Sequence, residues 1–272
     1  MKSQILPMFA SLALATSFAG AATIFSDDFS GGTGDLNGTT PDTTTGGATW
    51  VASSLFDANG DANITDAVGG SSSGGTATLA FTPMDGFVYT LEVSFGNVTT
   101  APDPGSTGDE SWLGLGFAAG QSTATSSNNR FINGDVIGLA WTFNRGSGAS
   151  GTFDNQAFLG DATAGSNPGL VDGAGWGLGT YGGNLDLRIV LDTTAGAGAW
   201  TATWLADTGS GFSVIRATET LLDENIDSVG IAASSGLVSG NINSFSLTSV
   251  PEPSALVLVG LAGLAVVARR RR

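Results

Sequence analysis

The chain of 272 residues contains neither cysteine nor histidine. Without cysteine no disulfide can form and no thiol nucleophile is present, and without histidine a Ser-His-Asp triad cannot be assembled. The histidine and cysteine ligands of ordinary zinc sites are missing as well. These two absences exclude several large classes of enzyme and of metal centre.

Basic residues are also scarce, with nine lysines and arginines against 24 aspartates and glutamates. Between the two ends of the chain there is no lysine, and the only arginines are Arg130, Arg145, Arg188 and Arg216. That stretch carries a net charge of about −19, which repels phosphate backbones and excludes nucleic acid as a partner. It suits divalent cations, basic partners or simple solubility.

Between the ends, no segment shows a convincing apolar stripe of an amphipathic helix, and the alternation typical of strands dominates. Over residues 87–95 every second residue is apolar, with Thr90, Glu92 and Ser94 between them, which predicts a strand with one buried face. The best helical candidate, 218–226, amounts to one turn. The other predicted strands are 24–29, 49–51, 77–81, 112–117, 137–143, 156–159, 185–191, 200–205, 212–216, 229–232 and 245–247. About a dozen short strands separated by turn residues predict an all-β fold, an antiparallel two-sheet sandwich.

The C-terminus combines a Pro-Glu-Pro neck, an apolar segment and a basic stop, which are Pro251, Glu252 and Pro253, residues 255–268, and Arg269, Arg270, Arg271 and Arg272. Proline lacks an amide donor and restricts its neighbour, so the neck is expected to be extended, protease-accessible and outside sheets and helices. As a helix the apolar segment would cover about 21 Å, a short span for a hydrocarbon core of about 30 Å. The arginines favour the cytoplasmic side. An ordinary C-terminal membrane anchor is the alternative interpretation.

This tail resembles the PEP-CTERM sorting signal of Gram-negative bacteria in all three parts and in their order. The resemblance implies recognition by an exosortase and cleavage near the Pro-Glu-Pro. It also implies transfer from an inner-membrane precursor to the cell surface or extracellular matrix, often beside exopolysaccharide. It covers residues 250–272 and does not bear on the activity of the remainder.

The N-terminus agrees with export. Lys2 supplies a positive start, an interrupted apolar stretch runs over 5–18, and Ala19 and Ala21 form the small-x-small pattern of signal peptidase sites. We expect cleavage after Ala21 or Ala22, with a retained anchor as the alternative. The expected division of the chain is a signal peptide over 1–22, a β-sandwich body over 23–249 and a sorting segment over 250–272.

Three groups of segments in the body carry a second resemblance: 25–29 with 36–38 and 48–50, 187–192 with 200–204, and 229–231 with 242–247. They resemble the first strands, the central hairpin and the closing pair of strands of the concanavalin A-like lectin/glucanase superfamily, particularly laminin-G-like bacterial domains. The resemblance implies a jelly-roll whose first and last strands pair and, in many members, glycan contact on a concave sheet.

Catalytic carboxylates are not arranged in a usable way. Glycoside hydrolysis needs two of them about 5–10 Å apart, and the Glu-x-Asp-x-x-Glu strand motif of glucanases in this superfamily is absent. Asp109 and Glu110 are adjacent, so on a strand they would point to opposite faces. Glu92 stands without a second acid in its strand, as a solvated outer-face residue would. We therefore expect no enzyme activity, and a glycosidase or polysaccharide lyase is the remaining catalytic alternative.

Asp57, Asn59 and Asp61 offer oxygen ligands at alternate positions, as calcium loops do, although the following residues do not fit an EF-hand. Asn59 followed by glycine is also a strong hairpin signal. The segment thus predicts either a plain hairpin or a calcium site at the sheet rim. By analogy with such sandwiches, Asp27 and Asp28 would contribute to that site. No other cofactor is expected.

Six tryptophans offer faces on which sugar rings stack. Most of them alternate with small residues on predicted strands, so core packing is the better explanation. Trp176 lies among glycines that provide little cover, and it is the best candidate for glycan stacking.

These features predict a non-catalytic protein that is exported and sorted to the cell surface or extracellular matrix. A lectin-like, glycan-binding module, with or without calcium, is the second hypothesis. The expected partners are an exosortase-type enzyme, the membrane and exopolysaccharide.

Overall fold

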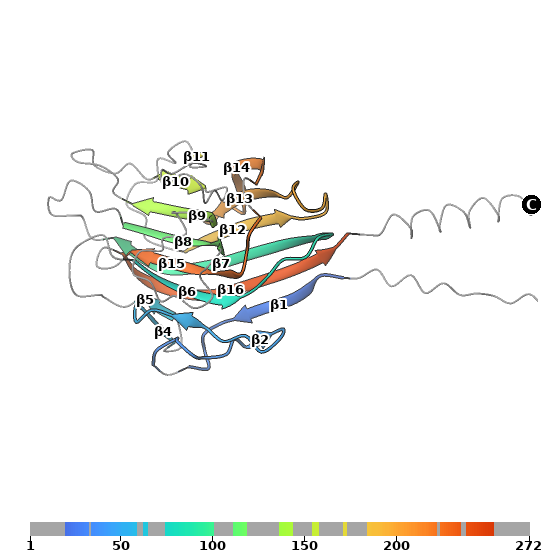
Figure 1. Ribbon diagram of the computed structural model, residues 1–272. Coiled ribbons are helices and arrows are strands. Elements are labelled where there is room, and N and C mark those ends of the chain that lie inside the picture. The colour runs from blue at the N-terminus through green and yellow to red at the C-terminus, as the bar shows by residue number, and fades with distance from the viewer. Residues whose placement is uncertain are drawn as a thin grey trace, which may run out of the picture.

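The computed structural model describes residues 20–32, 34–58, 62–64, 74–100, 111–118, 136–143, 154–157, 171–172, 184–221, 224–234 and 238–252. Within these ranges β-strands are the only regular secondary structure, and they form two antiparallel sheets around one hydrophobic core (Figure 1). The all-β, two-sheet sandwich that the alternation predicts is therefore confirmed.

The larger sheet has nine strands. Seven follow the order β14 (Ser213–Thr220), β13 (Thr201–Asp207), β12 (Leu185–Asp192), β7 (Phe87–Thr100), β16 (Val238–Pro251), β1 (Ala22–Asp27) and β2 (Thr43–Thr44). The other two are β4 (Phe56–Ala58) and β5 (Ala62–Ile64), and β5 also pairs with β16. The first and last strands of the body, β1 and β16, are neighbours, as the superfamily resemblance implied. The predicted central hairpin is also present as β12 and β13.

The smaller sheet has seven strands, in the order β11 (Val171–Asp172), β10 (Asp154–Ala157), β9 (Val136–Phe143), β8 (Ser111–Ala118), β15 (Ser228–Ser234), β6 (Gly74–Ala80) and β3 (Val51–Ala52). The expected closing pair is wrong, because its two segments belong to different sheets. β15 pairs with β6 and β8, whereas β16 pairs with β7 and β1. The chain crosses from one sheet to the other between them, so both apolar faces turn toward the same core.

Alternation along β7 and β12 places their apolar residues in the core and their polar residues outside. Leu91 and Val93 are fully buried, and the neighbouring strand contributes Leu187 and Ile189. On the outer face Glu92 lies opposite Arg188, with 2.6 Å between Glu92 Oε2 and Arg188 Nη2. The outer-face position expected for Glu92 is confirmed, and its partner is a cation on the adjacent strand.

The tryptophans whose side chains are described lie in the core. Trp50, Trp200 and Trp204 are at most 6% exposed. The packing explanation is therefore confirmed for these three. Trp176 and the side chains of Trp112 and Trp141 lie outside the described part of the chain.

The strands that sequence reasoning missed are β2, β4, β5 and β11, each two or three residues long. β4 and β5 pair antiparallel, with Phe56 opposite Ile64 and Ala58 opposite Ala62, which agrees with a hairpin around Asn59. The register leaves the three residues 59–61 between the paired positions rather than the two of an Asn-Gly turn. The turn itself lies outside the described residues, so calcium binding there stays a prediction. Among the described residues of 218–226 no helical turn is present, because β14 continues to Thr220 and residues 221 and 224–226 form no helix.

β1 begins and β16 ends at the same end of the sandwich (Figure 1). Within the described ranges no helix is long and apolar enough to cross a bilayer. Most of the predicted signal peptide and the predicted membrane helix over 255–268 lie outside those ranges.

Candidate functional site

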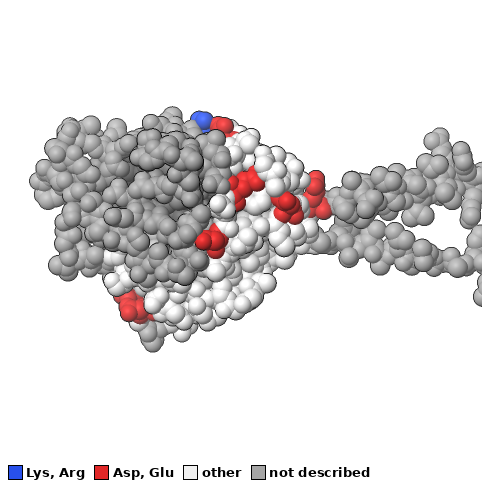
Figure 2. Space-filling view, in the orientation of Figure 1, with Lys and Arg blue, Asp and Glu red and all other residues white. Residues whose placement is uncertain are grey.

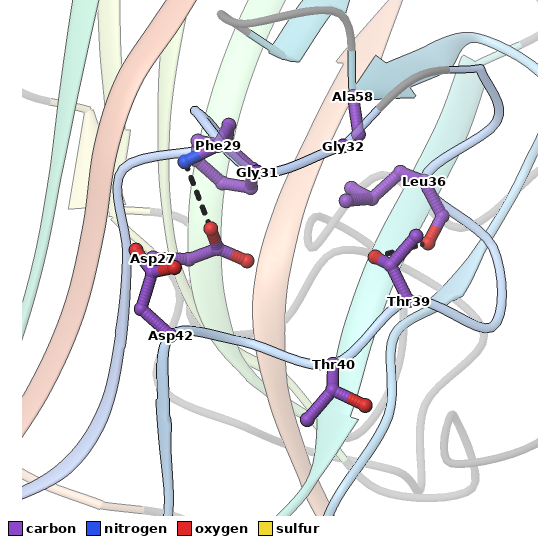
Figure 3. A pocket seen from close by; sticks show the side chains of 9 residues that line it. All are labelled: Asp27, Phe29, Gly31, Gly32, Leu36, Thr39, Thr40, Asp42 and Ala58. Atoms are coloured by element: carbon purple, nitrogen blue, oxygen red, sulfur yellow. Dashed lines mark hydrogen bonds between the residues drawn. The ribbon is translucent and has the colours of Figure 1, made fainter.

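A pocket of about 210 Å³ lies at the C-terminal end of β1, at Asp27. Residues from the end of β1, the turn after it, the loop before β2 and the end of β4 line it. Figure 3 shows Asp27, Asp42 and Phe29 along one side of the pocket and Leu36 and Thr39 on the other.

Asp27 connects this pocket to the core. Its carboxylate is only 7% exposed and accepts two hydrogen bonds, from the Phe29 amide at 2.8 Å and from the Trp50 indole Nε1–H at 2.7 Å. Burial raises the pKa of Asp27, the two hydrogen bonds partly oppose this, and the nearby charges of Asp42 and Asp28 raise it further. The backbone of Phe29 is in the left-handed region, with φ of 56°, which is unusual for a bulky residue. Asp27 therefore stabilises a strained turn beside the pocket.

Three carboxylates gather here. One oxygen from each of Asp27, Asp28 and Asp42 lies within 4.8 Å of the others. Asp42 Oδ2 accepts the Asp28 amide at 3.0 Å. The Ser30 side chain and then the Ser30 amide, which donates to Asp28 Oδ1 at 2.9 Å, lower the pKa of Asp28. Oxygens of this kind are the ligands that calcium prefers, so these residues are able to hold a cation. Their hydrogen bonds also satisfy them without one.

Asp27 and Asp28 are expected to contribute to a calcium site with Asp57; the structure brings them together with Asp42 instead, and calcium binding stays a prediction. Sequence reasoning missed Asp42, because it lies 14 residues from Asp28 in a polar segment without alternation. Its only signal is its place after Pro41, where aspartate commonly forms turns.

Asp57 does not belong to this cluster. Its backbone forms an isolated antiparallel bridge with Asp35, and the next residue, Ala58, donates its amide to the Gly34 carbonyl at 2.6 Å and lines the pocket. A side chain added at Gly32 would place its Cβ 2.6 Å from that of Ala58, so the wall of the pocket requires glycine there. The other proposed calcium ligands, Asn59 and Asp61, and the proposed stacking residue Trp176 lie outside the described residues and stay predictions.

The described part of the sorting neck is not free. Ser249 pairs with Ala22 of β1, Pro251 pairs with Phe87 of β7, and the Glu252 amide donates to the Gly86 carbonyl at 2.8 Å. The expectation of a neck outside the sheet is thus wrong for Pro251, and Glu252, which follows the strand, is hydrogen-bonded to the loop before β7. Ala21 and Ala22 are exposed, whereas Ala19, Pro253 and the four terminal arginines lie outside the described ranges.

Comparison with known proteins gives one family match. Residues 249–272 match the PEP-CTERM protein-sorting motif, and no curated protein matches the chain. The chain therefore carries the signal of an exported protein with a membrane-anchored precursor, and the resemblance of its tail is confirmed.

Solved structures resemble the body. Peanut lectin with a bound nonapeptide has 11% sequence identity and a TM-score of 0.50, over 85% of this chain and 98% of that one. Lectin II from Ulex europaeus has 15% identity and a TM-score of 0.43, over 78% and 91% of the two chains. The endo-1,3-β-glucanase from Streptomyces sioyaensis has 16% identity and a TM-score of 0.44, over 91% and 100%. The likeness to peanut lectin shows a shared β-sandwich fold and nothing about activity.

Proposed function

We propose that this protein is a non-catalytic β-sandwich that reaches the cell surface or extracellular matrix after an exosortase-type enzyme has cut its C-terminal segment. The observation that carries the proposal is the sorting motif at residues 249–272, which continues directly from the last strand of the body. The absence of cysteine, histidine and a paired catalytic-carboxylate motif supports a role without chemistry. The acidic body suits a soluble surface component that repels its own copies.

Mass spectrometry of the mature protein, combined with cell fractionation, tests this proposal. We expect the surface or released fraction to begin near Thr23 and to lack Arg269, Arg270, Arg271 and Arg272. A variant in which Pro251, Glu252 and Pro253 are all alanine should stay in the inner membrane. Recovery of the wild-type chain in that membrane only, with Arg272 intact, would replace sorting with simple anchorage.

Glycan binding is the second candidate, and the pocket favours it. At about 210 Å³ the pocket is smaller than the sites of drug-sized ligands and suits one small polar ring. Asp42, Thr39 and Thr40 line it with oxygen atoms that sugar hydroxyl groups can bond. It lies roughly 20 Å along β1 from the end at which the sorting segment leaves the body, so it would face away from the membrane.

A glycan array, read with calcium and with EDTA, tests the second candidate. We expect Asp42→Asn to weaken any glycan signal by about tenfold or more, because a charge-assisted acceptor is lost. Asp192→Asn is the control. The Asp192 carboxylate lies away from the pocket and accepts hydrogen bonds from Thr194, so this change should leave the glycan signal unchanged. If the wild-type protein binds no glycan on the array, the structural role is the one that remains.

A further inference from the structure

The neck of the sorting segment is held by one loop of the body, residues 84–87, here called the clamp loop. Pro251 lies opposite Phe87 in the ladder between β16 and β7, and the Glu252 amide donates to the Gly86 carbonyl at 2.8 Å. Within the described residues this is the last hydrogen bond between the chain and the sheet. Two residues of the Pro-Glu-Pro therefore belong to the folded body.

The clamp loop is itself fixed from three sides. The fully buried Thr193 hydroxyl lies 2.7 Å from the Met84 carbonyl oxygen and 2.8 Å from that of Phe87, and it accepts the Phe87 amide at 3.1 Å. The Tyr89 hydroxyl accepts the Met84 amide at 2.9 Å, and Trp200 Nε1–H donates to Asp85 Oδ1 at 2.8 Å. The carbonyl that receives Glu252 is thus part of a rigid, well-bonded surface.

Pro251 fits into this ladder without the loss of a hydrogen bond. In an antiparallel ladder successive amides point to alternate sides, and the Glu252 amide points to β7. The nitrogen of Pro251 therefore faces the β1 side, where the pairing of β1 ends at Ala22 opposite Ser249. The missing donor leaves no bond of the ladder unmade, so β16 can extend into the motif.

We infer that the folded body limits where its own sorting segment can be cut. The inference rests on the proposed processing of that segment. An endoprotease binds its substrate as an extended strand and needs free backbone on both sides of the bond. A cut at or before Glu252 requires several paired residues of β16 to separate from β7, whereas a cut after Pro253 requires only Pro251 and Glu252 to separate from the clamp loop. In a paired strand the longer opening is the more rarely populated one. Cutting of the folded chain is therefore directed to bonds after Glu252.

The full-length chain in detergent, treated with an endoprotease that cuts proteins after proline, tests the clamp directly. The peptides 252–272 and 254–272 report cutting after Pro251 and after Pro253, so the two sites compete within one molecule. We expect the second cut to be faster by about tenfold or more. Equal rates at the two sites in the folded wild-type chain would overturn the inference.

Two insertions form a matched pair. Gly-Ser-Gly placed between Val250 and Pro251 moves the whole motif beyond the clamp loop, and the two cuts should then occur at similar rates. The same three residues placed after Pro253 should preserve the wild-type preference. Thr193→Val, which removes the hydroxyl that fixes the clamp loop, should reduce the preference without touching the motif. An unchanged preference after the first insertion would show that the proline sites differ for reasons other than the fold.

Processing in cells separates this inference from the proposed function. We expect the first insertion to add mature C-termini upstream of Glu252 that the wild type and the second insertion lack. If no variant is processed at all, the proposed function fails. The proteolysis in detergent then still tests whether the clamp loop protects the bond after Pro251. If all variants are processed at the same bond relative to the motif, the body does not limit the cut.

Discussion

Asp27 is the residue on which the candidate pocket depends. It is buried, it bonds the indole of Trp50 and the strained amide of Phe29, and it lies beside two further carboxylates. Trp50 in turn packs edge-on against Phe245 of β16, with ring centroids 5.0 Å apart. One side chain thus couples a polar rim to the core.

Trp50→Phe should destabilise the protein by about 2 kcal/mol, because it leaves a buried carboxylate oxygen without its donor. This corresponds to a fall in Tm of about 4–8 °C, measured by thermal denaturation. Trp204→Phe is the matched control, because its indole donates at 2.8 Å to an uncharged acceptor, the Gly138 carbonyl. Its cost should be about 1 kcal/mol. Equal losses in the two variants would argue against a charged Asp27.

The pH dependence of stability should also reveal Asp27. Because its pKa is raised above the ordinary 3.8, the folded state holds the proton more tightly than the unfolded state. Protonation of Asp27 therefore stabilises the folded state. This stabilisation is complete below the pKa of the unfolded state and is lost as pH rises through the pKa of the folded state. Urea unfolding of wild type and Asp27→Asn between pH 4.5 and 7.5 should therefore show the wild type losing stability relative to the variant as pH rises. A relative gain would contradict the burial of this carboxyl group.

Long strands were predictable from sequence at the level of elements, and short ones were not. β7, β8, β9 and β12 each present a full alternating face, so their apolar residues identify the core directly. β2 and β11 are only two residues long, too short for alternation to appear. The pocket escaped prediction for a related reason, because its walls come mainly from the turn after β1 and the loop before β2, with single residues from the ends of β1 and β4, and such segments show no alternation. Only the two adjacent acids, Asp27 and Asp28, gave a local signal for it.

Gly230 of β15 lies directly against the backbone of β6. A Cβ added at Gly230 would overlap the Ala77 carbonyl oxygen, which belongs to the backbone and cannot rotate away. Gly230→Ala should cost about 3 kcal/mol or more, or prevent folding. Gly31→Ala adds a Cβ into open space and should change the unfolding free energy by less than about 0.5 kcal/mol. Chemical denaturation of both variants measures this, and a tolerated Gly230→Ala would show that the pairing is wrong.

At the scale of the whole molecule, the charged side chains are mostly acidic, with 24 aspartates and glutamates against nine lysines and arginines. On the face shown in Figure 2, acidic side chains are spread over the described surface and the few basic atoms lie next to acidic ones. Among the described residues, both arginines, Arg188 and Arg216, are already engaged in ion pairs with Glu92 and Glu219. The remaining acids repel one another.

Sodium chloride should therefore stabilise the protein. Screening at 0.3–0.5 M shortens the range of repulsion to about 5 Å, and we expect Tm to rise by about 2–5 °C before it levels off. Sucrose at the same osmolarity controls for effects of solute exclusion. A Tm that falls with salt would show that attractive pairs outweigh the repulsion.

The place of β16 between β7 and β1 determines the order in which this chain can mature. When a protein leaves the cytoplasm N-terminus first, β16 is the last strand to be exported. β7 and β1 therefore lack the strand that lies between them until the final residues of the body have crossed. During that interval the neck would be unpaired. If the proposed processing enzyme acts from the membrane, it would meet two successive substrates, first an unfolded polypeptide and then a folded domain, and the rate at which β16 pairs with its neighbours would decide which one it cuts.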